Sequence, residues 1–263
     1  MRRAARLLLL GLGCTFALRC GPALRHHPPP RAPDPASARG QFTLASFNLY
    51  FPASDDAATV ELIAQTGADV IFLQEVSPDW ESTLRRRYGQ AYPQMLFAPG
   101  GGASGLGVLS RFPLADEGFL PAALKHPAWL IGVQTPAGEA HVLNVHLRAS
   151  KRPGQNLFAG LFSMGADHEL EIRHFVGACS VEPTLIVGDF NEGQGGSAVE
   201  WLDRRGFVDA LARFRPGEPT WRALGGLFES TLDHILFRAS LPARDAWVVR
   251  GGNSDHWPLL ARF

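Results

Sequence analysis

The most informative stretch of the sequence reads Thr184-Leu185-Ile186-Val187-Gly188-Asp189-Phe190-Asn191. Its first four residues are apolar or β-branched, which is typical of a strand that is buried on both faces of a sheet. Asp189 and Asn191 follow that run directly, where the strand ends and the chain turns. The stretch therefore predicts polar side chains that are presented at the edge of a buried sheet.

Other apolar runs along the chain also have polar residues at their ends. Predicted strands at residues 42–47, 69–73 and 141–145 lead to Asn48, Glu75 and His146, and strands at 234–237 and 259–263 are preceded by Asp233 and by Asp255 with His256. Further strands are predicted at 106–110, 130–134 and 246–249. Any one of these polar residues is ordinarily a turn former or a solvated group. Together they predict a single crevice at the sheet edges.

Helices are predicted between several of these strands. Ser54 is expected to cap a helix over 55–65 that stops at Gly67, and Trp80, Leu84 and Tyr88 mark the buried face of a second helix after Pro78. Helices are also expected over 167–178 and near 197–204. Strands and helices in this mixed order predict an α/β fold in which sheets pack together and helices lie outside them.

The first forty residues are predicted to lie outside the folded domain. Arg2, Arg3 and Arg6 precede an apolar run over 7–18, so residues 1–20 are expected to be an export signal or an N-terminal anchor. Cys14 offers a site for lipidation, which leaves a periplasmic, secreted or membrane-anchored protein as the alternatives. Residues 21–40 are rich in Pro and Ala and predict a linker. Residues 41–263 are expected to form one domain, and nothing in the sequence suggests more than a monomer.

The charge distribution argues against one class of partner. The chain has 25 basic and 25 acidic residues, but its first forty residues hold seven arginines and one acid, so the 18 basic and 24 acidic residues that remain leave a net charge of −6. A net acidic domain is poorly suited to tight, sequence-independent binding of duplex DNA, which depends on neutralising many phosphates.

The polar residues at the strand ends suit metal-assisted phosphoester chemistry. Mg²⁺ prefers carboxylate oxygens and uses few protein ligands, and it polarises a phosphoryl oxygen. A histidine titrates near neutral pH and exchanges protons with water, while a neighbouring carboxylate fixes its tautomer. Gly105 and Gly107 are expected to allow tight packing near the site, and residues 99–104 to form a mobile loop at its rim.

In order and residue type, these segments resemble the endonuclease/exonuclease/phosphatase superfamily, which includes deoxyribonuclease I and the bacterial sphingomyelinases. The resemblance covers residues 41–263. It implies a four-layer α/β/β/α sandwich of the deoxyribonuclease I type and a Mg²⁺-dependent phosphoesterase, with Mn²⁺ as an alternative cofactor.

The resemblance also implies a role for each matching residue. Glu75 resembles the principal metal ligand, which Asn48 assists, and Asp255 resembles an acid on the metal side. Asp189 and Asn191 resemble the pair that orients the attacking water and contacts the phosphate or a second metal. His256 resembles the general base or a phosphate-binding histidine with Asp233 as its carboxylate partner. His146 resembles the histidine that binds the phosphate or protonates the leaving oxygen.

Several features bear on the substrate. His146 stands where abasic-site endonucleases carry Tyr, and Thr231-Leu232-Asp233-His234 differs from the Trp-Cys-Asp-Arg of inositol phosphatases, so both subfamilies are disfavoured. No glutamate among Glu81, Glu117 and Glu139 is well placed to pair with His146 as in deoxyribonuclease I. Arg148 and Lys151 supply positive charge for a nucleic-acid backbone or a lipid headgroup.

These features favour a nuclease or general phosphodiesterase as the interpretation. A sphingomyelinase-like or phospholipase C-like enzyme, and a phosphomonoesterase on the same scaffold, remain alternatives. An exported binding module that has lost catalysis is the alternative from another class, although the full set of acids and histidines argues against it.

Overall fold

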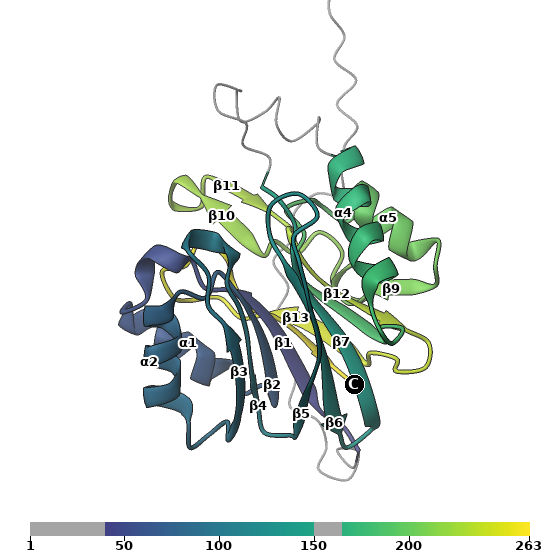
Figure 1. Ribbon diagram of the computed structural model, residues 1–263. Coiled ribbons are helices and arrows are strands. Elements are labelled where there is room, and N and C mark those ends of the chain that lie inside the picture. The colour runs from purple at the N-terminus through teal and green to yellow at the C-terminus, as the bar shows by residue number, and fades with distance from the viewer. Residues whose placement is uncertain (1–39, 150–164) are drawn as a thin grey trace, which may run out of the picture.

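The computed structural model describes residues 40–149 and 165–263, in which two six-stranded sheets pack against each other with helices on their outer faces (Figure 1). This arrangement confirms the predicted α/β/β/α sandwich. Some predictions concern residues outside these ranges. They are the export signal or anchor, the linker apart from Gly40, and the role of Lys151.

The first sheet contains the N-terminal strand at its centre. Its order is β13 (Asp245–Val248), β14 (Leu259–Arg262), β1 (Thr43–Asn48), β2 (Val70–Gln74), β4 (Leu106–Ser110) and β3 (Gln94–Ala98). β1 and β2 run parallel, with Asn48 opposite Gln74, so their carboxyl ends lie at the same edge of the sheet.

The second sheet repeats this arrangement with other strands. Its order is β5 (Leu114–Leu120), β6 (Ala128–Thr135), β7 (Gly138–His146), β8 (Leu185–Asp189), β12 (Asp233–Arg238) and β9 (Phe207–Asp209). β7 and β8 are parallel, with His146 opposite Asp189, whereas β12 runs antiparallel to β8 and places Asp233 opposite Asp189. A separate hairpin is formed by β10 (Trp221–Ala223) and β11 (Phe228–Ser230).

The helices lie on the outer faces of the two sheets. α1 (Ala57–Thr66) and α2 (Pro78–Tyr88) cover the first sheet, and α4 (Gly165–Ala178) and α5 (Ser197–Asp203) cover the second (Figure 1). The short helices are η1 (Phe51–Ala53), η2 (Gly102–Ser104), α6 (Ala210–Phe214) and η3 (Leu224–Gly226). None of the helices in the described ranges is both long and apolar enough to span a membrane.

Three apolar layers hold the sandwich together, because successive side chains of a strand point to opposite faces. Val70 and Phe72 of β2 belong to the core between the two sheets, whereas Ile71 and Leu73 pack beneath α1 and α2. Ile186 of β8 contributes to the third layer, beneath α4 and α5. Strands that are buried on both faces cannot slip by one residue without exposing a whole apolar row, so the polar residues at their ends are held in fixed positions.

The prediction that Ser54 caps the first helix is wrong. α1 begins at Ala57, and its cap is Asp56, whose side chain accepts a hydrogen bond of 2.6 Å from the backbone N–H of Thr59. The helix ends as predicted, with Gly67 in the left-handed conformation at a φ of 62°. Trp80, Leu84 and Tyr88 are buried on α2, which confirms the predicted core face of that helix.

Candidate active site

The strand ends bring residues of both sheets together at one edge. The described polar residues at this edge are Asn48, Glu75, His146, Asp189, Asp233 and His256. A continuous chain of contacts joins them, although they come from positions up to 208 residues apart in sequence. The predicted convergence is therefore present in the structure.

Asn48 joins the two sheets at this edge. Its amide nitrogen donates to Glu75 Oε1 at 3.2 Å and to Asp189 Oδ2 at 3.0 Å. Its amide oxygen accepts from the backbone N–H of Tyr50 at 3.1 Å, so the side chain is fixed at both ends. Asn48 is 1% exposed. It holds a carboxylate from each sheet toward the same point, and its predicted role as a ligand in its own right stays a prediction.

Asp189 lies at the centre of the group. Its Oδ1 accepts from the backbone N–H of Asn191 at 2.8 Å, and its Oδ2 is 3.5 Å from His146 Nε2 and 3.6 Å from His256 Nε2. Burial raises the pKa of Asp189 to about 7; the negative charge of Asp233 adds to this rise and the His256 cation opposes it. A carboxylate in this setting is a ready acceptor for a proton or a cation.

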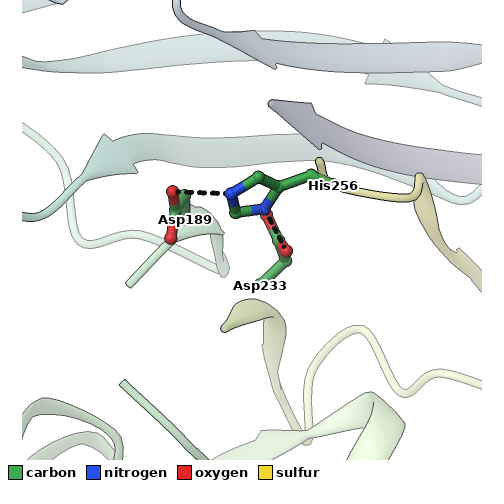
Figure 2. A group of neighbouring side chains, drawn as sticks. All are labelled: Asp189, Asp233 and His256. Atoms are coloured by element: carbon green, nitrogen blue, oxygen red, sulfur yellow. Dashed lines mark hydrogen bonds and ion pairs between the residues drawn. The ribbon is translucent and has the colours of Figure 1, made fainter. Parts of the chain in front are cut away.

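His256 is paired with a buried carboxylate. Its Nδ1 lies 2.8 Å from Asp233 Oδ2, and Figure 2 shows its ring between Asp233 and Asp189. Burial disfavours the imidazolium, but Asp233 and Asp189 outweigh that effect and raise the pKa of His256 to about 10. His256 is consequently a cation at neutral pH, with Nδ1–H donated to Asp233 and Nε2–H directed toward Asp189.

His146 is in the opposite state. Its Nδ1–H donates to the backbone carbonyl of Ala103 at 3.0 Å, so the unprotonated Nε2 of the neutral ring faces Asp189. Burial, together with His126 and His256, holds the pKa of His146 well below its usual value. The predicted lack of a glutamate partner agrees with the structure, because Glu117 binds His141 Nδ1 at 2.8 Å instead.

Three of the predicted residues are engaged at the margins of the group. The side-chain amide of Asn191 donates to the backbone carbonyl of Leu147 at 2.9 Å. Arg148 forms an ion pair with Asp167 at 3.0 Å. Asp255 accepts from the indole N–H of Trp221 at 3.1 Å and is not among the three residues whose ligand atoms lie within 4.8 Å of one another. The roles predicted for Asn191, Arg148 and Asp255 stay predictions.

The backbone is strained beside the site. In the described part of the chain, four residues other than glycine have a positive φ, and three of them are Tyr50, Glu75 and Asn191, at 62°, 60° and 52°. Such conformations cost free energy and persist where surrounding contacts enforce them, commonly at functional sites. Here the hydrogen bonds to Asn48, Asp189 and Leu147 supply that enforcement.

Sequence reasoning missed several residues that support the site. Ser254 is fully buried; its hydroxyl donates to the Asn48 carbonyl at 2.8 Å and accepts from the His256 N–H at 3.1 Å. Gln74 donates to Asn144 Oδ1 at 2.7 Å beneath the site and so links the two sheets. Gln74 and Asn144 could have been recognised as amide side chains within otherwise apolar strands. No feature of the sequence indicated the role of Ser254.

The carboxylates fit a divalent cation. Asp189, Asp233 and His256 offer ligand atoms close together, but Asp233 and His256 already bind each other at 2.8 Å. A pair bonded in this way is better suited to proton transfer and charge stabilisation than to coordination. Glu75 and Asp189, which Asn48 holds toward each other, form an oxygen-donor pair that matches the preference of Mg²⁺. We therefore favour this pair as the ligands.

Comparison with known proteins supports a phosphoesterase site, as the geometry does. The model of the Endonuclease/Exonuclease/phosphatase family matches residues 45–256. No curated protein sequence matches the chain.

Solved structures share the fold at low sequence identity. An endonuclease/exonuclease/phosphatase from Beutenbergia cavernae aligns with a TM-score of 0.66 and 17% identity over 84% of this chain and 71% of that one. TDP2 from D. rerio, complexed with a single-strand DNA product, aligns with a TM-score of 0.61 and 15% identity over 84% of this chain and 98% of that one. The 3′ phosphatase NExo from Neisseria, bound to a product DNA hairpin, aligns with a TM-score of 0.57 and 17% identity over 84% of this chain and 98% of that one.

Proposed function

The chain belongs to the endonuclease/exonuclease/phosphatase family, and from this premise we propose that it is a Mg²⁺-dependent phosphodiesterase that cleaves nucleic acid. Hydrolysis of phosphoester bonds is the chemistry of the family. The carboxylates of the site support the metal, and the solved relatives support the substrate.

One observation carries the proposal. A single oxygen of Asp189 contacts the Asn48 amide and lies within 3.6 Å of both histidines, and the same amide contacts Glu75. Two carboxylates and two imidazoles therefore meet at one point of the sheet edge, a combination of groups that suits a phosphate and a cation that balances its charge. Water, phosphate and leaving oxygen must be held in line for displacement, and converging rigid side chains supply that alignment.

Each side chain has a role that follows from its protonation state. The His256 cation can donate a hydrogen bond to a phosphate oxygen, which fits a phosphate-binding role better than the general-base role, since a general base must be unprotonated. The Asp189 carboxylate, which lies at the centre of the group, can accept a hydrogen bond from the attacking water. Phosphate charge beside the neutral His146 would favour protonation of its Nε2, which could then donate to the leaving oxygen.

A divalent cation bound by Glu75 and Asp189 would supply polarisation of a phosphoryl oxygen and offset the charge that develops on it. Asn48 would fix the two ligands, because it donates to both at 3.2 and 3.0 Å. Such fixing of ligands is worth about 10- to 100-fold in affinity or activity at many metal sites.

Nucleic acid as the substrate is supported by the solved relatives. Two of the solved relatives hold DNA products, which favours nucleic acid over a lipid headgroup. The net charge of −6 on the domain argues against tight, sequence-independent binding of duplex DNA.

A substrate panel tests the proposal. The full-length protein is assayed on single- and double-stranded DNA, RNA, a bis-aryl phosphodiester, an aryl phosphomonoester and sphingomyelin, with Mg²⁺, with Mn²⁺ and with EDTA. We expect hydrolysis of the diester and of nucleic acid that requires the metal. Activity confined to the monoester would assign a phosphatase, activity confined to sphingomyelin would assign a lipid substrate, and hydrolysis that EDTA leaves intact would contradict the metal.

Variants make the panel specific to this site. His256→Ala is expected to abolish diester hydrolysis while the melting temperature shows a folded protein. Val181→Ala is a control with a similarly simple truncation, since Val181 is 40% exposed and precedes β8 at the sheet edge opposite Asp189. Loss of activity in both variants would point to a general defect and would count against the assigned site.

A further inference from the structure

A second histidine lies against His146 and was not anticipated from the sequence. His126 precedes β6, whose first residue, Ala128, pairs with Val145 at the end of β7. The rings of His126 and His146 are stacked, with centroids 4.3 Å apart and planes only 4° from parallel. No other aromatic pair measured in the described residues lies closer or flatter.

His126 is buried and makes no hydrogen bond through its ring. It is 3% exposed, and within the described structure neither ring nitrogen has a hydrogen-bond partner. Buried polar atoms nearly always have partners, so an exception calls for an explanation. The contact that His126 does make is the flat stack on His146.

His146 needs the orientation that this stack can give. Within the described residues, its one hydrogen bond goes to the carbonyl of Ala103 in η2, a turn that begins at Gly102 and follows Gly100 and Gly101. One hydrogen bond at Nδ1 fixes the direction of that N–H, but the plane of the ring is set by its packing contacts. The His126 ring lies flat against that plane.

We propose that His126 is a positioning residue whose ring stacks on His146 and fixes the plane in which Nε2 of His146 faces Asp189. The inference rests on the role proposed above for His146. Aromatic rings favour offset parallel stacking, and two cationic rings would repel each other in such a stack. Consistent with that, burial and the nearby Lys125 lower the pKa of His126 to about 4, so His126 stays neutral.

Substitutions at His126 separate the ring from its nitrogens. His126→Ala removes both, His126→Asn keeps a polar group without the ring, and His126→Phe keeps a flat ring without nitrogen. We expect Ala and Asn to lower kcat by about 10- to 100-fold with little change in KM, because misorientation of a reacting group costs rate more than binding. Phe should stay within about threefold of the wild type. If Phe overpacks the site, free imidazole added to His126→Ala should recover part of kcat.

Phe119→Ala is the matched control. Phe119 makes an edge contact of 5.7 Å with Trp129 on the neighbouring strands β5 and β6, so its removal disturbs the same part of the sheet without touching His146. Its kcat should equal that of the wild type. Melting temperatures of all variants show whether each is folded.

A proton NMR measurement of the His146 ring provides a readout that does not depend on activity. The ring current of a stacked neighbour shifts these protons, so the shift should persist in His126→Phe and disappear in His126→Ala. Folded His126→Ala with wild-type kcat would overturn the inference, as would His126→Phe that keeps the shift but loses as much kcat as Ala. A wild type without phosphoesterase activity would instead contradict the proposed function. If His146→Ala were inactive while His126→Ala kept its activity, the inference alone would be contradicted.

Discussion

Asp189 has a histidine on each side, at nearly equal distances of 3.5 and 3.6 Å, yet the two histidines are in opposite states. On one side, Asp233 raises the pKa of His256 to about 10. On the other side, His146 donates to a backbone carbonyl, and burial keeps its pKa well below the usual value. Burial disfavours the cation on both sides. The partner of Nδ1, a carboxylate or a carbonyl, therefore determines the charge of each ring.

The difference shows how one residue type serves two purposes at a single centre. A buried carboxylate partner makes a permanent hydrogen-bond donor that suits an anionic phosphate. A carbonyl partner makes a neutral ring that acquires a proton only when nearby negative charge favours it. If only their similar distances to Asp189 were considered, His146 and His256 would be assigned equivalent roles.

The largest expected effect comes from removing the centre of this comparison. Asp189→Asn should lower kcat by about 10³-fold or more, since it removes the charged carboxylate that both histidines face and with it a proposed metal ligand. The same variant should not lose stability in EDTA. The folded pKa of Asp189 is raised to about 7 from 3.8, so the metal-free wild type loses stability as pH rises from 4 to 7, and Asn lacks that loss. Activity assays and melting curves across this range check both statements. A marked fall in the melting temperature at pH 7 would contradict the burial argument.

The next largest effect should come from breaking the His256 side. Asp233→Asn removes the charge that sustains the imidazolium, and we expect kcat to fall by about 10²- to 10⁴-fold. In the wild type, the raised pKa of His256 contributes stability that is fully present below pH 6.5 and is lost as pH rises to about 10. Melting temperatures from pH 6 to 10 should therefore decline more steeply for the wild type than for Asp233→Asn. Parallel curves would show that Asp233 does not control the charge of His256.

These two residues were predicted from the sequence, and the reason is physical. Asp189 and Asp233 adjoin strands that are apolar on both faces, whose pattern fixes both the element and the position of its end. Antiparallel pairing of β8 and β12 then places the carboxyl end of one strand beside the amino end of the other, so the two carboxylates lie at the same edge of the sheet.

The parts that sequence reasoning missed lack such a pattern. β5 has a mixed and largely exposed surface, and β3 is no better buried, so neither gives a clear apolar run. The partner of His146 is a backbone carbonyl, which any residue can supply, and the stack of His126 on His146 joins positions on different strands. The different charge states of the two histidines, one cationic and one neutral, depend on these contacts and could not be predicted from residue types.

A smaller effect is expected from disturbing the His146 side through its carbonyl partner. A Cβ added at Gly105 would lie 1.8 Å from the Val76 carbonyl oxygen and 2.5 Å from the Gly100 nitrogen, so the chain segment that carries Ala103 would have to move. Gly105→Ala should lower kcat by about 10-fold and stability by about 1–3 kcal/mol.

Gly101→Ala is the matched control in the same loop, because a Cβ there meets nothing within 4 Å and the φ of −72° suits alanine. Its kcat and melting temperature should match the wild type. Equal loss of kcat in the two variants would show that the loop as a whole, and not the position of Ala103, governs His146.

The smallest effect should come from Glu117, whose place in the sequence makes it a poor partner for His146. Its carboxylate instead lies 2.8 and 2.9 Å from His141 Nδ1. Glu117→Gln should leave kcat within about twofold and lower the free energy of unfolding by about 0.5–1.5 kcal/mol, the ordinary contribution of one hydrogen bond. Urea titration and steady-state kinetics check the two numbers separately. A tenfold fall in kcat would mean that Glu117 acts on His146 in the working enzyme, and both histidines would then depend on carboxylates. The contrast between the two sides of Asp189 would disappear, whereas an unchanged kcat with a small loss of stability preserves it.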